Sequence, residues 1–207
     1  MGGLSSVLIA LGAWLQQPDL LLLGSPVTRA EWLGALLGLA MVGCNLRLHP
    51  MGWVLAILSA LLYALVFFES RLYGQVALQG LFIAMAVWGY WSWTQPARSP
   101  VPMSAKGRRL ALVVWMALSI GIGLVLDQTT DSALPYADAV PTAGSLLATV
   151  LLARRHPENW LVWAAVNALS VLLFAHQGLW PTVLLYAVMA ALSLWGWRTW
   201  RRLESGA

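Results

Sequence analysis

Residues 156–200 read HPENWLVWAAVNALSVLLFAHQGLWPTVLLYAVMAALSLWGWRTW, and this stretch decides the fold. Its two apolar runs, about residues 160–175 and 179–197, contain no Asp, Glu, Lys or Arg. Runs of this length form helices that cross a bilayer core of roughly 30 Å. Lipid supplies no hydrogen-bond partners, so each run must satisfy its own backbone as a helix. The runs are continuous rather than alternating, which excludes a transmembrane β-barrel.

A matching stretch lies 107 residues earlier, where residues 49–93 read HPMGWVLAILSALLYALVFFESRLYGQVALQGLFIAMAVWGYWSW. The two stretches align without a gap. Besides many leucines they share four features: His49-Pro50 with His156-Pro157, Trp53 with Trp160, Trp88-Gly89 with Trp195-Gly196, and Trp93 with Trp200. Leucine matches are frequent by chance in such a composition, whereas matched Trp and His-Pro in one register are not. The chain therefore contains an internal repeat.

The rest of the chain has the same apolar character. Of its 207 residues, 60% are hydrophobic and 10% are charged, whereas a soluble domain carries about 25% charge. The apolar runs predict seven spans, at about 31–46, 51–68, 73–93, 110–126, 139–153, 160–175 and 179–197. A further segment, residues 4–23, is interrupted by Gln16-Gln17-Pro18-Asp19 and either spans or lies partly in the membrane interface. We predict an all-α integral membrane bundle.

The basic residues predict the orientation, because cytoplasmic loops carry an excess of Lys and Arg. Ten of the 12 basic residues fall on one side of the predicted bundle: Arg47, Arg98, Lys106, Arg108, Arg109, Arg154, Arg155, Arg198, Arg201 and Arg202. Only Arg29 and Arg71 fall on the other side, where Asp127, Asp131 and Asp138 also lie. We therefore expect a cytoplasmic C-terminus. This asymmetry accounts for the net charge of +4 without a nucleic-acid partner.

Each copy of the repeat contains three spans, and one span lies between the copies. A direct fusion of three spans would invert the second copy, so the extra span makes the copies parallel. Parallel repeats occur in transporters, with the substrate site at the repeat interface near mid-membrane; a symmetric scaffold is the alternative. We predict a hydrophobic segment at 1–29, the first repeat at 30–95, a cytoplasmic loop, linker helix and outer loop at 96–135, and the second repeat with a cytoplasmic tail at 136–207.

The sixth span opens with Trp160-x-x-Trp163-x-x-x-Asn167. Positions i, i+3 and i+7 share one helix face, which here offers two indole planes and an amide that can donate and accept. A planar ligand could stack on the indoles while the amide holds its polar edge. In the alternative interpretation the tryptophans belong to an interfacial belt and Asn167 bonds a neighbouring helix.

The third and seventh spans carry matching polar stripes. Gln75 and Gln79 align with Thr182 and Tyr186, and Ser193 extends the second stripe. Such stripes in membrane helices predict a shared polar path for a substrate, and hydrogen bonding between helices is the alternative.

Two further pairs of positions are equivalent in the repeat. Glu69 and His176 lie at the outer ends of the second and sixth spans, where they are either an outer gate or ordinary boundary residues. Gly34 and Pro141 lie in the first and fifth spans, where they either act as hinges or allow close packing.

Several function classes lack their required residues. No span carries a Lys, Arg, Asp or Glu at its middle, where ion-coupled carriers usually place one and where a phosphate would need Arg or Lys. We find no P-loop, no Ser-His-Asp pattern and no metal-ligand cluster. The residues favour an uncoupled facilitator for an unphosphorylated aromatic solute, neutral or cationic. A non-transporting assembly or sensor subunit is an open alternative. An enzyme acting on lipid would need a nucleophile, a base or a metal site, and the spans offer none.

The sequence resembles the PnuC family of vitamin transporters over about residues 30–202. The resemblance is carried by the Trp160/Trp163/Asn167 motif, by Glu69, Leu72-Tyr73, Leu78-Gln79, Trp88-Gly89 and Trp93, and by Gly178-Leu179, Tyr186 and Trp195-Gly196. It implies a three-plus-one-plus-three fold related in plan to the sugar-transporting SWEETs. It also implies facilitated uptake of nicotinamide riboside, trapped by cytoplasmic phosphorylation for NAD synthesis.

Other substrates and partners remain open under this resemblance. Some members carry thiamine, riboflavin or deoxynucleosides instead. The expected substrate-binding residues are Trp160, Trp163, Asn167, Gln75, Gln79, Tyr186 and Thr182. The expected partners are the vitamin and the lipid bilayer of the inner membrane, with no cofactor or metal, and a homo-oligomer is an open alternative.

Overall fold

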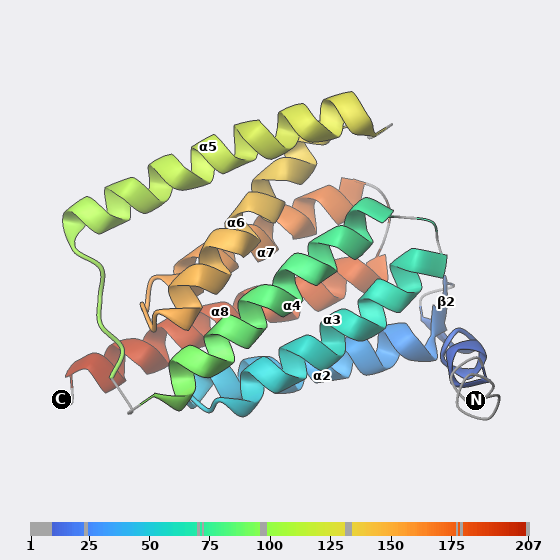
Figure 1. The fold of residues 1–207 in the computed structure, drawn as a ribbon, viewed down its shortest axis with the longest axis horizontal. Coiled ribbons are helices and arrows are strands. Elements are labelled where there is room, and N and C mark those ends of the chain that lie inside the picture. The colour runs from blue at the N-terminus through green and yellow to red at the C-terminus, as the bar shows by residue number, and fades with distance from the viewer. Residues whose placement is uncertain are drawn as a thin grey trace. The chain divides into compact units, whose positions relative to one another are not determined.

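A computed structural model describes residues 10–22, 25–69, 71, 73–95, 99–130, 134–176, 178 and 180–205. After a short helical turn at 10–15, two strands and seven helices follow in order (Figure 1). They are β1 (Pro18–Leu22), β2 (Ser25–Thr28), α2 (Arg29–Leu46), α3 (Met51–Glu69), α4 (Tyr73–Thr94), α5 (Ala105–Thr129), α6 (Pro135–Ala153), α7 (Asn159–His176) and α8 (Trp180–Ser205). The chain divides into two compact units, Met1–Trp91 and Ser92–Ala207.

Each of the seven sequence-predicted spans lies on one of the helices α2 to α8. Four helices, α3, α5, α6 and α7, are long and apolar enough to cross a membrane. The other three, α2, α4 and α8, have 18, 22 and 26 residues, which is also the length that a bilayer requires. The lengths of these helices and the apolar composition of four of them confirm the prediction of an α-helical membrane protein.

The N-terminal segment differs from a continuous span. Helical structure at 10–15 is followed by β1, which pairs antiparallel with β2. Pro18 follows this turn and cannot donate a helix hydrogen bond. The Arg29 guanidinium fastens the hairpin to α2, because it donates to Asp19 Oδ1 at 3.1 Å and to Gln17 Oε1 at 3.1 Å. The described part of segment 4–23 therefore forms no single helix, and residues 4–9 lie outside the described residues.

The turns of the two units have the same local geometry at positions 107 residues apart. Leu48 and Arg155 both adopt left-handed backbone, with φ of 54° and 58°. The next residue closes each turn, since the His49 N–H donates to the Cys44 carbonyl and the His156 N–H to the Leu151 carbonyl, both at 2.9 Å. The later turns also match, with left-handed backbone at Arg71 and Gly178. The sequence repeat is therefore also a repeat of backbone conformation.

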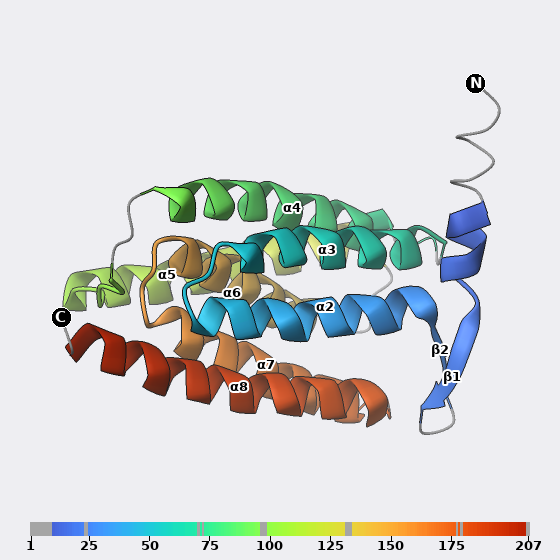
Figure 2. The same ribbon diagram turned by 90° about the horizontal axis from the view of Figure 1, so that it is seen from below.

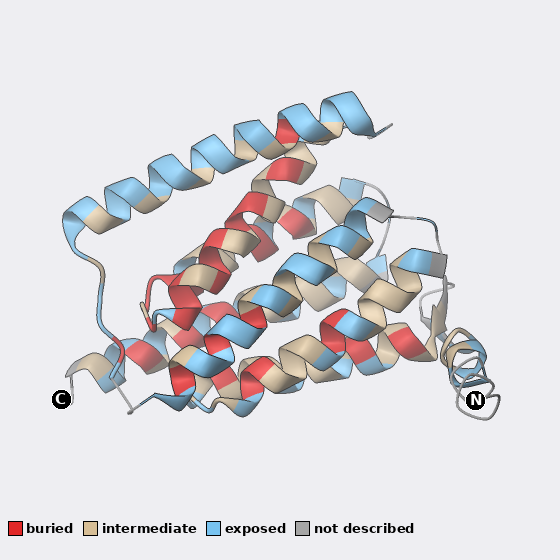
Figure 3. Ribbon diagram, in the orientation of Figure 1, coloured by how far each residue is buried: buried red, intermediate tan, exposed pale blue. Residues whose placement is uncertain are grey.

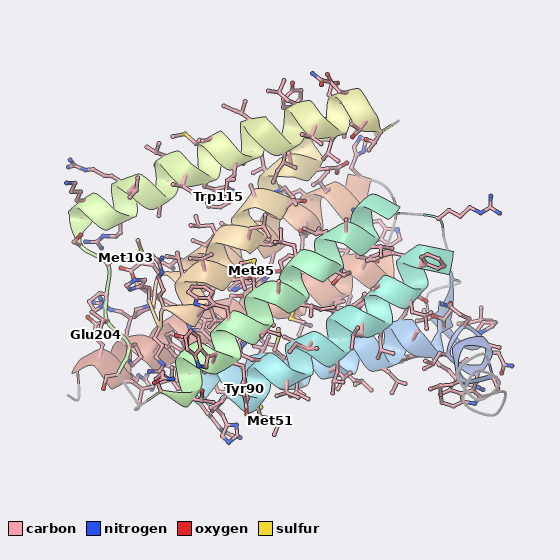
Figure 4. All side chains as sticks on the ribbon, viewed as in Figure 1. Met51, Met85, Tyr90, Met103, Trp115 and Glu204 are labelled. Atoms are coloured by element: carbon pink, nitrogen blue, oxygen red, sulfur yellow. The ribbon has the colours of Figure 1, made fainter. Side chains whose placement is uncertain are left out.

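Helix α6 is the buried centre of the second unit, and α5 covers part of it (Figure 3). Within the membrane-length windows, 50% of α6 but 11% of α5 is buried. Trp115 reaches from α5 toward α6 (Figure 4) and donates its indole N–H to the Val140 carbonyl at 2.9 Å. This bond uses a carbonyl beside Pro141, where the α6 helix carries an internal proline. Most of the α5 surface is therefore exposed.

Candidate functional site

Helices α7 and α8 lie side by side in the second unit (Figure 2) and carry most of the sequence-predicted site residues. Helix α7 begins after the His156-Pro157 turn, where the Asn159 side chain donates to the His156 carbonyl at 2.7 Å. Three contacts, described in the next paragraphs, join the two helices from the start of α7 to its end. We call these three contacts together the α7–α8 contact face.

The first contact is made by Trp160, which is buried with 3% exposure. Its ring lies against Gly196, where an added Cβ would fall 2.6 Å from Trp160 Cε2. Its edge meets Trp200 with the ring centroids 5.6 Å apart. The first unit repeats this packing, because a Cβ on Gly89 would fall 2.6 Å from the ring of Trp53. Trp160 therefore packs the helices together, although its indole N–H has no partner among the described residues.

The second contact is polar and lies near the middle of both helices. Asn167 is 4% exposed, and its Nδ2 donates to Ser193 Oγ at 3.2 Å. Ser193 in turn donates to the Met189 carbonyl at 2.7 Å. The equivalent positions of the first unit are Ala60 and Ala86, so this polar pair occurs in one copy of the repeat only. Asn167 thus bonds a neighbouring helix, as the packing interpretation expects. Its amide oxygen makes no hydrogen bond to a described residue.

The third contact is the stacking of Phe174 on Tyr186, with the ring centroids 5.2 Å apart and the planes inclined by 28°. Thr182 lies one turn before Tyr186 and is half-buried. Trp163 is also half-buried and lies on α7 between the first two contacts, one turn before Asn167. Of the two indoles in the motif, that of Trp160 packs against Gly196 and that of Trp163 does not.

The remaining candidates lie elsewhere in the fold. On α4, Gln75 is exposed and Gln79 is half-buried, and neither side chain is bonded to another described residue. His176 is exposed at the end of α7. Glu69 ends α3, but its side chain lies outside the described residues, so the gate pair is untested.

A cavity of about 500 Å³ in the second unit is lined by none of the sequence-predicted site residues: its lining is Ser92, Gln95, Ser99, Val101, Ala153, Arg154 and Arg155. Arg155, 8% exposed, donates to the Trp93 carbonyl at 3.1 Å and lies 5.6 Å from the centre of that indole ring. The last four carbonyls of a helix have no hydrogen-bond partner within the helix, and this bond satisfies one of them at the end of α4. The charge pattern in the sequence placed Arg155 in a loop and gave no sign of its burial.

The comparisons with known proteins all match transporters, and the solutes named for these transporters differ. The profile of a family described as nicotinamide mononucleotide transporter matches residues 28–202. The nicotinamide riboside transporter PnuC of Escherichia coli is 23% identical, over 86% of this chain and 87% of its own length. The riboflavin/roseoflavin transporter RibM of Streptomyces davaonensis is 24% identical, over 90% of this chain and 91% of its own.

A solved structure has the same fold. The crystal structure of the vitamin B3 transporter PnuC superimposes with a TM-score of 0.71 over 97% of this chain and 87% of that chain, at 22% identity. Together the profile, the relatives and the fold confirm the resemblance drawn from the sequence motifs.

Proposed function

This chain belongs to the nicotinamide mononucleotide transporter family, and from that premise we propose that it is a passive facilitator for nicotinamide riboside or a closely related vitamin. The proposed function rests on the family match over residues 28–202. Support comes from the relative named nicotinamide riboside transporter, which aligns over most of both chains. The chain is a multi-pass membrane protein, and we place it in the cytoplasmic membrane with its C-terminus inside the cell.

The charge distribution favours the riboside over the phosphorylated mononucleotide. A phosphate group is usually bound by Arg or Lys through charge-assisted hydrogen bonds. The basic residues of α5 and α8 lie in the first turn or the last turns, and no Lys or Arg lies at the middle of a span. Nicotinamide riboside instead carries a pyridinium ring, and a cation gains from the faces of tryptophan rings. Phosphorylation inside the cell would then trap the solute.

In this proposal Trp163 stacks on the vitamin ring and Asn167 holds its polar edge. Support comes from the half-buried indole of Trp163 and from the buried amide one turn away. Trp160 packs α7 against α8 at the start of the α7–α8 contact face. Tyr186 and Thr182 contribute the polar stripe of α8, and Gln75 and Gln79 contribute that of α4. Glu69 and His176 are assigned to an outer gate.

We also propose the three-plus-one-plus-three arrangement, in which α2–α4 and α6–α8 are parallel repeats joined by α5. The matched turns and the matched Trp–Gly contacts of the two units support it. The mode of transport follows from charge, since no Lys, Arg, Asp or Glu lies at the middle of a span, where a coupling ion would act. Flux should therefore follow the solute gradient alone.

Riboflavin is the second candidate substrate, because the Streptomyces davaonensis relative is named for it and aligns over 91% of its length. Isothermal titration of the purified protein with nicotinamide riboside, riboflavin and thiamine distinguishes these candidates. We expect the tightest binding for nicotinamide riboside. Tighter binding of riboflavin would replace the proposed substrate, and binding of none of the three would refute the proposal.

A further inference from the structure

The orientation of the Asn167 amide is determined by the hydrogen bonds of Ser193. A serine hydroxyl has one proton to donate and lone pairs to accept. Ser193 directs that proton to the Met189 carbonyl at 2.7 Å, so toward Asn167 its oxygen can only accept. The amide nitrogen and not the amide oxygen must therefore face Ser193, as the 3.2 Å contact has it.

The amide oxygen is consequently the free polar atom of this pair. Asn167 is 4% exposed, and Oδ1 makes no hydrogen bond to any described residue. This oxygen is not one of the fully buried unpartnered side-chain atoms of the described residues, so it keeps some accessible surface at which a ligand can donate a hydrogen bond. Trp163 precedes this amide by one helical turn and provides a half-buried aromatic plane on the same face. An aromatic ligand against that plane would meet an acceptor at its edge.

We infer that Ser193 is a positioning residue that holds Asn167 in one orientation, so that the site offers an acceptor and selects ligands with an N–H donor on the ring edge. This inference rests on the proposed function and specifies the chemistry of its site. The carboxamide of nicotinamide has such a donor. Because Ala60 and Ala86 occupy the equivalent positions, only the second repeat makes this selection.

The matched probe is 3-acetylpyridine riboside, which replaces the carboxamide NH2 by a methyl group and keeps the pyridinium charge and the shape. Uptake of labelled nicotinamide riboside into protein-containing liposomes is measured while either unlabelled riboside competes. In the wild type, the acetyl compound should inhibit roughly 5- to 150-fold more weakly, because Asn167 Oδ1 then stays unpaired. In Ser193→Ala the amide is free to rotate and donate, so this ratio should fall toward one.

The ratio separates positioning from structural damage, because a damaged fold weakens both ligands equally. Ser170→Ala is the control, since Ser170 is buried like Ser193, with 5% exposure, but lies on α7, and its removal should leave the ratio unchanged. Ser193→Cys is a second variant of similar volume whose sulfur is a weak acceptor, and it too should lower the ratio. A wild-type ratio near one, or an unchanged ratio in both Ser193 variants, would overturn this inference alone. Absence of nicotinamide riboside uptake by the wild type would instead overturn the proposed function.

Discussion

Replacing Asn167 by leucine separates packing from substrate binding at the middle of the α7–α8 contact face. Leucine has the same branching and the same number of heavy atoms as asparagine and suits a membrane helix, so the helices should still pack. The lost protein contact is the 3.2 Å bond to Ser193, whose own bond to Met189 remains. Hydrogen bonds between membrane helices contribute about 0.6 kcal/mol on average, so the melting temperature should fall only slightly.

The expected effect on the substrate is larger. A ligand group that loses a desolvated hydrogen-bond partner forfeits about 1–3 kcal/mol, which corresponds to a roughly 5- to 150-fold higher Kd. Titration calorimetry with nicotinamide riboside and initial uptake rates in liposomes measure this loss. Asn167→Leu should therefore bind weakly while its melting temperature stays near that of the wild type.

Ser59→Ala is the matched control in the first unit. Ser59 is 8% exposed and donates to the Gly34 carbonyl at 2.9 Å, so its removal also deletes one buried bond between helices. We expect the same small loss of stability with unchanged binding. Wild-type affinity and uptake in a well-folded Asn167→Leu protein would refute the reasoning, because Asn167 would then serve packing only.

Two further predictions follow from packing and topology. Gly196→Ala should lower the melting temperature, because its Cβ would overlap the Trp160 indole and overpacking costs about 1–3 kcal/mol. Gly80→Ala is the control, because no atom lies within 4 Å of the added carbon. Equal melting temperatures for the two variants would contradict the close contact. In a Cys44→Ala background, a membrane-impermeant thiol reagent added outside intact cells should label Thr130→Cys but not Ser104→Cys, because the basic residues predict a cytoplasmic start of α5. The reverse labelling would overturn the proposed orientation.

The positions of the helices could be predicted from the sequence because the membrane leaves little choice. Runs such as residues 51–68 and 160–175 must be helical in lipid, and the structure has α3 at Met51–Glu69 and α7 at Asn159–His176. The same reasoning could not find the β1–β2 hairpin. Its first strand begins at Pro18, and the hairpin is held by side-chain bonds from Arg29. The lengths of apolar runs do not reveal such bonds.

The candidate site was only partly predictable, for a similar reason. Helical spacing puts Trp160, Trp163 and Asn167 on one face of α7, but it does not say which partner each side chain meets. The pairing of Asn167 with Ser193 and the packing of Trp160 on Gly196 depend on how α8 is shifted along α7. The repeated Trp and Gly positions indicated the first contact in advance, since Trp53 and Gly89 match Trp160 and Gly196.

The central claim is uncoupled transport of nicotinamide riboside by this chain alone, and flux in liposomes that contain only the purified protein tests it most directly. Labelled nicotinamide riboside should enter until the inner and outer concentrations are equal, and preloaded solute should leave at a comparable rate. Imposed proton or sodium gradients should change neither result, because no span carries a Lys, Arg, Asp or Glu at its middle. Accumulation above the outer concentration under a proton gradient, or binding without any flux, would contradict the account.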